Sequence, residues 1–289
     1  MIQNQTENCM VNASKDKYSS YSPTCNKPII YRSPDLERNA SCGSGSFQNY
    51  RIADITASFR GEGQRLRELW AEYQFDGDEA PEIIIDISSR HLTELQKENP
   101  DLSADECASA IISSWFYEAL FDFEGFRLHA SAVVLDGKAY LFSAPSGTGK
   151  STHTSLWLEY FGMERSHIIN DDTPIIRCVG NRYIVYGSPW SGSSNINRND
   201  SAPLQGIAFI ERSQNNWIHP LSEEEAVFCL LNQARRTAVP TRLNTMLSLL
   251  GELIKKVPIY RMGCTRGHSA VSMAYTAMLG RRGKQAYVF

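Results

Sequence analysis

The chain has 289 residues, 42% of them hydrophobic and 21% charged, which is typical of a globular protein large enough for two domains. A formal net charge of −3 gives no electrostatic reason to expect nucleic acid or an anionic membrane as a partner. No apolar run reaches the length of a membrane span, and the first thirty residues lack the apolar segment of a secretory signal, so we expect a cytoplasmic location.

The N-terminal part predicts a leader followed by a small α/β region. Residues 1–48 are rich in Asn and Ser and predict a flexible leader, in which only residues 29–31 resemble a strand. Residues 49–121 predict a strand at 52–59, a helix at 64–75 and a buried strand at 82–87. A capping box at Ser103 and Glu106 predicts a helix through Leu120. The pattern of predicted strands and helices changes near residue 121, which predicts a domain boundary there.

Residues 122–289 predict a second domain with strands and helices interleaved. The pattern favours strands at 126–134 and 138–143 across an Asp136-Gly137 turn, and at 174–179 and 182–186 across Gly180-Asn181. Further strands are expected at 167–169, 206–210 and 257–262, and helices at 152–161, 222–236, 241–256 and 268–279. Several hairpins among helices predict a mixed sheet with helices against it, an α/β fold of α+β character.

A glycine-rich loop stands between a predicted strand and a predicted helix. Residues 144–152 read APSGTGKST and match the phosphate-binding pattern G-x-x-x-x-G-K-[ST], with alanine in the first glycine position. Lys150 would neutralise phosphate oxygens of ATP, and the Ser151 hydroxyl would hold Mg²⁺. The expected phosphate contacts are Ser146, Gly147, Thr148, Gly149, Lys150, Ser151 and Thr152. The alternative is an ordinary glycine-rich turn that caps a helix.

Phosphoryl transfer also requires a carboxylate for the metal and a group that activates the acceptor. Asp171 and Asp172 follow a short apolar strand, and adjacent carboxylates shift each other's protonation, which favours one metal ligand and one base. The alternative is an Asn-Asp-Asp turn. His129 lies on the strand predicted to pair with the one that leads into the loop, where it is either catalytic or a core residue. His153 we interpret as structural.

Taken together, His129, the loop SGTGKST and the NDD sequence resemble the kinase core of HPr kinase/phosphorylase and ATP-dependent phosphoenolpyruvate carboxykinase. The closest resemblance is to HPr-kinase-like bacterial proteins that carry SAPSGTGKSTHT, GSPWSG and KVPIYRMGC, here residues 143–154, 187–192 and 256–264. It covers residues 122–280 and implies a P-loop in a mixed, hairpin-rich sheet. It assigns Lys150 to the β and γ phosphates, Ser151 to the metal, the aspartates to metal and base, and His129 to the phosphates.

The sequence departs from the resemblance in two places. HPr kinases carry a glutamate after the acidic pair that helps to hold the metal, whereas residues 187–200 contain none, with Asp200 a poor substitute. The arginines that bind a dicarboxylate in the carboxykinases have no counterpart that we can locate. The role of the GSPWSG segment stays open between a substrate loop with Ser188, Trp190 and Arg198, and a tight turn with its tryptophan in the core. No role is assigned to Arg212, Arg235, Arg236 or Arg261.

The function expected from these features is a Mg²⁺- and ATP-dependent kinase that phosphorylates a hydroxyl, on a serine of a small protein or peptide or on a small molecule. The alternatives are a nucleotide-gated binding module without transfer and the carboxykinase reaction. The acceptor is not identified by the sequence. HPr kinases are hexamers, so the resemblance also implies a homo-oligomer.

Overall fold

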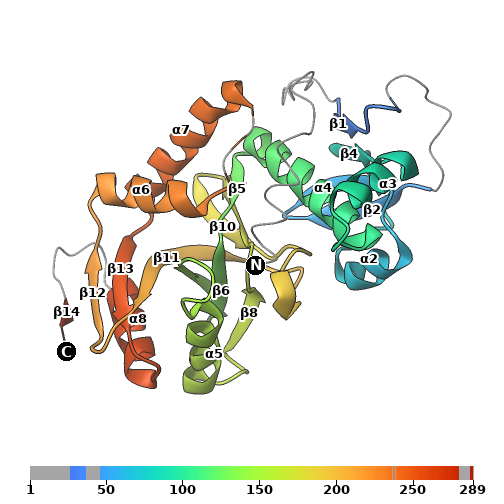
Figure 1. The fold of residues 1–289 in the computed structure, drawn as a ribbon. Coiled ribbons are helices and arrows are strands. Elements are labelled where there is room, and N and C mark those ends of the chain that lie inside the picture. The colour runs from blue at the N-terminus through green and yellow to red at the C-terminus, as the bar shows by residue number, and fades with distance from the viewer. Residues whose placement is uncertain (1–26, 37–45, 236, 238, 280–286, 289) are drawn as a thin grey trace. The chain divides into compact units, whose positions relative to one another are not determined.

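A computed structural model describes residues 27–36, 46–235, 237, 239–279 and 287–288 (Figure 1). The chain divides into two compact units, Met1–Phe123 and Glu124–Phe289. Both are mixed α/β, as the hairpin-rich pattern predicts. In the described part of the chain, no helix is both long and apolar enough to cross a lipid bilayer.

The first unit is built on a four-stranded sheet whose strand order is β1-β4-β3-β2. The strands are β1 (Ile29–Arg32), β2 (Gln48–Ile52), β3 (Ile55–Arg60) and β4 (Ile83–Asp86). The helices are α2 (Gln64–Leu69), α3 (Ser89–Glu98) and α4 (Ala104–Ala119), with 3₁₀ turns at Ala71–Tyr73 and Leu120–Phe123. The capping box of α4 forms as predicted, because Ser103 and Glu106 each bond to the other's backbone N–H.

Three expectations for this unit are corrected. Residues 29–32 pair in parallel with β4, so this part of the expected leader belongs to the sheet, while residues 1–26 and 37–45 lie outside the described residues. The strand expected at 52–59 is a hairpin, since Ala53 and Asp54 both turn with positive φ, at 54° and 57°. The helix expected at 64–75 ends at Leu69.

The first unit also holds a buried acid. The side chain of Glu62 is fully buried, and its Oε1 lies 3.3 Å from Nε of Arg67. Burial raises the pKa of Glu62 to about 7, although the arginine charge acts in the opposite direction.

The second unit contains a mixed sheet to which ten strands of the described chain contribute. They are β5 (Gly125–Arg127), β6 (Ala130–Leu135), β7 (Lys138–Ser143), β8 (Ser166–Asn170), β9 (Ile175–Val179), β10 (Arg182–Tyr186), β11 (Ser201–Arg212), β12 (Trp217–Pro220), β13 (Ile259–Cys264) and β14 (Tyr287–Val288). Its helices are α5 (Lys150–Phe161), α6 (Glu223–Gln233), α7 (Pro240–Lys256) and α8 (His268–Leu279), with a 3₁₀ turn at Gly192–Ser194.

The strand neighbours in this sheet decide which loops meet. The series runs β8-β6-β7-β11-β13-β12. Strands β7, β11 and β13 are parallel, so their carboxyl ends lie at one edge, while β6 and β8 run antiparallel to each other and β6 antiparallel to β7. The loops that follow β7, β11 and β13 therefore gather at that edge.

The predicted strand at 126–134 is two strands with different partners. β5 pairs with β9, whereas β6 pairs with β7 and β8. Leu128 and His129 connect the two strands and belong to neither of them. His129 thus precedes β6 instead of lying within it, and its N–H donates to the carbonyl of Gln233, at 2.9 Å. This connection places its ring at the carboxyl end of β7.

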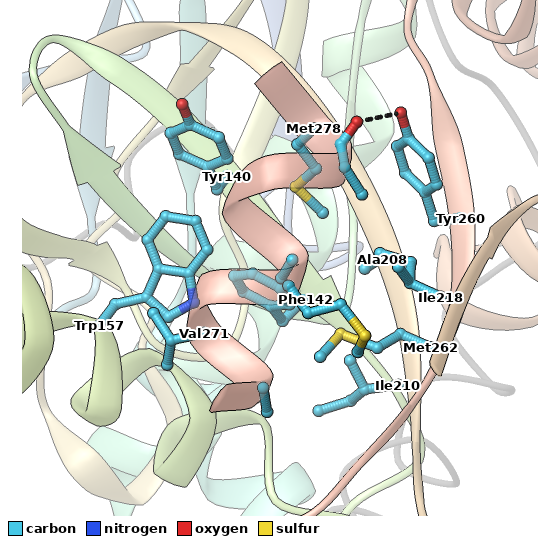
Figure 2. Close-up of a cluster of buried hydrophobic side chains, with 14 of the residues drawn as sticks. Tyr140, Phe142, Trp157, Ala208, Ile210, Ile218, Tyr260, Met262, Val271 and Met278 are labelled. Carbon is cyan, nitrogen blue, oxygen red and sulfur yellow. Dashed lines mark hydrogen bonds between the residues drawn. The ribbon is translucent and has the colours of Figure 1, made fainter. Parts of the chain in front are cut away.

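Helices α5 and α8 cover this sheet through a shared core (Figure 2). Trp157 of α5 packs on Tyr140, with ring centroids 4.8 Å apart, and Val271 and Met278 of α8 lie in the same buried cluster. The Tyr260 hydroxyl donates to the carbonyl of Ala277, at 2.9 Å, and so joins the end of α8 to β13. The helix that begins at the glycine-rich loop is therefore anchored to the sheet through Trp157.

Candidate functional site

The glycine-rich loop joins the carboxyl end of β7 to the first turn of α5. Gly147 and Gly149 adopt positive φ, 76° and 120°, which side-chain-bearing residues rarely take, so both glycines are required by the backbone. Gly149 is the N-cap of α5 and provides no side-chain hydrogen bond. The first-turn N–H groups of α5 lack intrahelical acceptors and carry the positive end of the helix dipole, which makes this end of the loop suited to an anion.

Lys150 and His129 meet beside this loop. Nζ of Lys150 donates to the carbonyl of Ala144 and lies 3.0 Å from Nε2 of His129. Burial lowers the pKa of Lys150, while the carboxylates of Asp172 and Asp171 act in the opposite direction. A lysine side chain already held in place by these two contacts can exchange them for phosphate oxygens.

The orientation of His129 is set from helix α6. Its Nδ1 lies 3.0 Å from Oε1 of Gln233, the last residue of that helix. In the tautomer in which Nδ1 donates to this amide oxygen, Nε2 is left to accept from Lys150. The same Nε2 lies 3.4 Å from Oδ1 of Asp172. Lysine, histidine and aspartate thus form one contiguous group.

The two aspartates differ in their surroundings. Asp171 is 6% exposed, and its Oδ1 accepts a 2.5 Å hydrogen bond from the buried hydroxyl of Ser131, which also lies 2.7 Å from the Thr154 hydroxyl of α5. Asp172 is half-buried and turns toward His129. The pair is therefore asymmetric, with one carboxylate fixed in the interior and the other partly open.

The Asn-Asp-Asp turn is held by the GSPWSG segment. The Asn170 amide donates to the carbonyls of Ser188 and Trp190, at 2.9 and 3.2 Å, and both of those residues are buried. Gly192 lies beside Asp172, since a Cβ there would come within 3.2 Å of its carboxyl carbon. The GSPWSG segment is therefore the tight turn with its tryptophan in the core, and not an open substrate loop at Ser188 and Trp190. Through Asn170 it positions the acidic pair.

Arg212 contacts the loop, which the sequence did not indicate. From the end of β11 its guanidinium donates to the carbonyls of Gly147 and Thr148, at 2.6 and 3.2 Å. Arg198 is exposed, and Arg236 lies outside the described residues. His153 is buried in the core, where its Nε2 accepts from Trp157 and burial lowers its pKa to about 4. This agrees with its structural interpretation.

The loop and the acidic pair were identified by local motifs, but their supporting residues were not. Gln233 lies 104 positions from His129, and Arg212 lies 65 from Gly147, so no local pattern joins them. Ser131 is one of many small residues in an apolar strand and carries no signal of its own. Among the described residues, no group of three or more His, Cys, Asp or Glu is placed to hold a metal ion.

Comparison with known proteins gives one family. No curated protein matches the chain. The model of the family described as SynChlorMet cassette protein ScmC matches residues 107–267, a span that includes His129, the glycine-rich loop, the acidic pair and Arg212. Because the match covers more than half of the 289 residues, the chain belongs to the ScmC family of SynChlorMet cassette proteins.

Proposed function

We propose that this protein binds ATP with Mg²⁺ and transfers the γ-phosphoryl group to a hydroxyl, as an HPr-kinase-like P-loop kinase. The observation that carries the proposal is the convergence of Lys150, His129 and Asp172 beside a loop with positive φ at Gly147 and Gly149. Positioning and charge stabilisation make up most of the catalysis in phosphoryl transfer, and this group offers both. The resemblance of residues 122–280 to the HPr kinase core supports the same function.

The donor atoms fit a magnesium ion. Ser151 is exposed in the first turn of α5, and Asp171 is linked to the same helix through Ser131 and Thr154, whose hydroxyl donates to the Ser151 carbonyl. Hydroxyl and carboxylate oxygens are the hard ligands that Mg²⁺ prefers, and we expect Ser151 and one or both aspartates to hold it. When bound, the ion would neutralise charge on the β and γ phosphates.

The two aspartates suit different roles. Asp171 is buried and accepts from Ser131, so it is suited to a fixed position on the metal side. Asp172 is partly open and contacts His129, so it is the better base for an acceptor hydroxyl. Lys150 would leave the Ala144 carbonyl for phosphate oxygens, and His129, held by Gln233, would keep the ammonium directed at them.

The proposal is tested by phosphoryl transfer from γ-labelled ATP with Mg²⁺ to a panel of serine peptides and small alcohols. Lys150→Ala and Asp172→Asn should each lower transfer by about 100-fold or more, since each removes a group that acts in the transition state. Lys138→Ala is the matched control, because Lys138 is an exposed residue at the start of β7. Equal background rates in wild type and both site variants would refute transfer.

A nucleotide-gated binding module without transfer is the second candidate. One observation favours it. Asp200, the carboxylate in the segment where HPr kinases carry the metal-binding glutamate, already has partners within the protein. It lies 2.9 Å from Nε2 of His167 and accepts from the N–H of Ser201, at 2.7 Å. Tight ATP binding with no transfer to any acceptor would support this function, and Mg²⁺-dependent labelling of an acceptor would exclude it.

A further inference from the structure

A second feature, a half-open cavity of about 440 Å³, lies at the carboxyl edge of the same sheet. It is lined by the loop after β11, the residue after β13, and one face of α8: Gln214, Asn215, Asn216, Thr265, Ser269, Ser272, Met273 and Thr276. Its volume is within the range of small-molecule sites.

The lining carries no charge. Amides and hydroxyls make up all of it except Met273, so the cavity can form several hydrogen bonds but cannot neutralise a phosphate. Part of this surface is already ordered, because Asn216 donates to Ser269, at 2.9 Å, and accepts from the N–H of Thr265, at 2.8 Å. A neutral polar molecule with a flat apolar face is the chemistry that such a lining recognises.

The cavity is joined to the phosphate loop through Arg212. Its guanidinium holds the carbonyls of Gly147 and Thr148, and Gln214 follows two residues later, so their Cα atoms are at most about 7 Å apart. The loop and the cavity therefore share the segment after β11, and a ligand whose phosphates lie on the loop would reach the cavity along this edge of the sheet.

The strand order places this cavity on the opposite side of β7 from His129 and Asp172, the residues proposed to act on the acceptor hydroxyl. His129 and Asp172 lie at the ends of β6 and β8, on one side of β7, whereas the cavity follows β11 and β13, on the other side. The transferring phosphate and the acceptor belong on the first side, which leaves the second for the other end of the nucleotide. Ligands of open α/β sheets bind outside the carboxyl ends of the strands, in agreement with this direction.

We propose that this cavity binds the base and ribose of the nucleoside triphosphate whose phosphates lie on the glycine-rich loop. The proposal rests on the proposed function and adds the subsite that distinguishes a nucleotide from a bare polyphosphate. The amide side chains of Gln214 and Asn215 offer donors and acceptors to the base edge, and the α8 hydroxyls offer them to the ribose.

The test compares ATP with inorganic tripolyphosphate, each titrated with Mg²⁺ by calorimetry into the full chain. Ser272→Phe fills the cavity and should weaken ATP binding at least tenfold while tripolyphosphate binding changes less than twofold. Gln214→Ala, at an exposed position of the loop after β11, should weaken ATP binding alone by a smaller factor of two to five. Ser248→Phe, an exposed serine of α7, is the control.

Each other outcome counts against the proposal in a distinguishable way. If the Ser272 and Gln214 variants leave ATP affinity unchanged, or if ATP and tripolyphosphate weaken together, the base does not lie in this cavity, while the phosphate site stands. If wild type binds tripolyphosphate as tightly as ATP, the cavity contributes nothing. If wild type binds neither, the proposed function fails, and the subsite with it.

Discussion

The hydrogen bond between Ser131 and Asp171 gives a quantitative test of how the acidic pair is held. Both residues are buried, and Ser131→Ala removes the donor to a carboxylate at 2.5 Å. A hydrogen bond to a charged group contributes about 1.5–3 kcal/mol, and its loss leaves the buried oxygen without that donor. Thr154 should add no further cost, because its hydroxyl keeps the carbonyls of Lys150 and Ser151 as acceptors.

We therefore expect Ser131→Ala to lower the free energy of unfolding of the second unit by about 1.5–3 kcal/mol, which is roughly 3–12 °C in Tm for a unit of this size. Differential scanning calorimetry measures the change, with exposed Ser248→Ala of α7 as the control, expected within about 0.5 kcal/mol. A double-mutant cycle with Asp171→Ala should give a coupling energy of similar size. A Ser131→Ala change below about 0.5 kcal/mol, or a coupling near zero, would refute the reasoning.

Three further predictions concern Gly149, Gly251, and the pair of buried groups Glu62 and His153. Gly149→Ala should lower ATP affinity at least tenfold in calorimetry, because φ of 120° is strained for alanine, and unchanged affinity would contradict a required loop geometry. Gly251→Ala should stabilise the protein by about 0.5–1 kcal/mol in chemical denaturation, since it lies within α7 with open space around its Cβ, and a loss of stability would argue against that helix. Glu62 and His153 should contribute to the pH dependence of stability in opposite directions. Glu62, with its pKa raised to about 7, favours the folded first unit at acid pH, and up to roughly 3 kcal/mol of stability is lost as pH rises from 4.5 through 7. His153, with its pKa lowered to about 4, stabilises the second unit above pH 6.5, and that contribution is lost as pH falls toward 4. Calorimetric scans of wild type, Glu62→Gln and His153→Phe from pH 4 to 8 would show each slope disappear with its residue, and unchanged slopes would exclude these groups as the cause.

The sequence predicted those features whose signal is local. The glycine-rich loop, the turn at Asp136-Gly137 and the capping box at Ser103 and Glu106 each fall within a few consecutive residues. The turn and the capping box form as predicted, and the loop joins a strand to a helix as predicted. Helix α8 begins and ends where its apolar spacing predicts. In such segments the backbone conformation is decided by the residues that adopt it.

Features that depend on distant partners were not predicted. The run from Phe126 to Val134 contains no glycine or proline, so nothing local marks the change of strand partner at His129. The hairpin at Ala53-Asp54 lacks the glycine that such turns usually carry. Helix α3 buries no residue and carries only two aliphatic side chains, Leu92 and Leu95, and the strand β12 is only four residues long.

The same distinction holds for the site. Motifs supplied Lys150, Ser151 and the aspartates, but the contacts that orient them come from remote elements. Gln233 at the end of α6 fixes His129, and Arg212 at the end of β11 holds the loop carbonyls. The order of the strands in the sheet brings these residues together, and this order cannot be predicted from any single segment of the sequence.

The most direct test of the central claim is calorimetric titration of the full chain with ATP and Mg²⁺. The account predicts one ATP per chain, with affinity reduced at least tenfold by Lys150→Ala and unchanged by Lys138→Ala. Absence of binding, or equal affinity in wild type and Lys150→Ala, would contradict a nucleotide site at the glycine-rich loop.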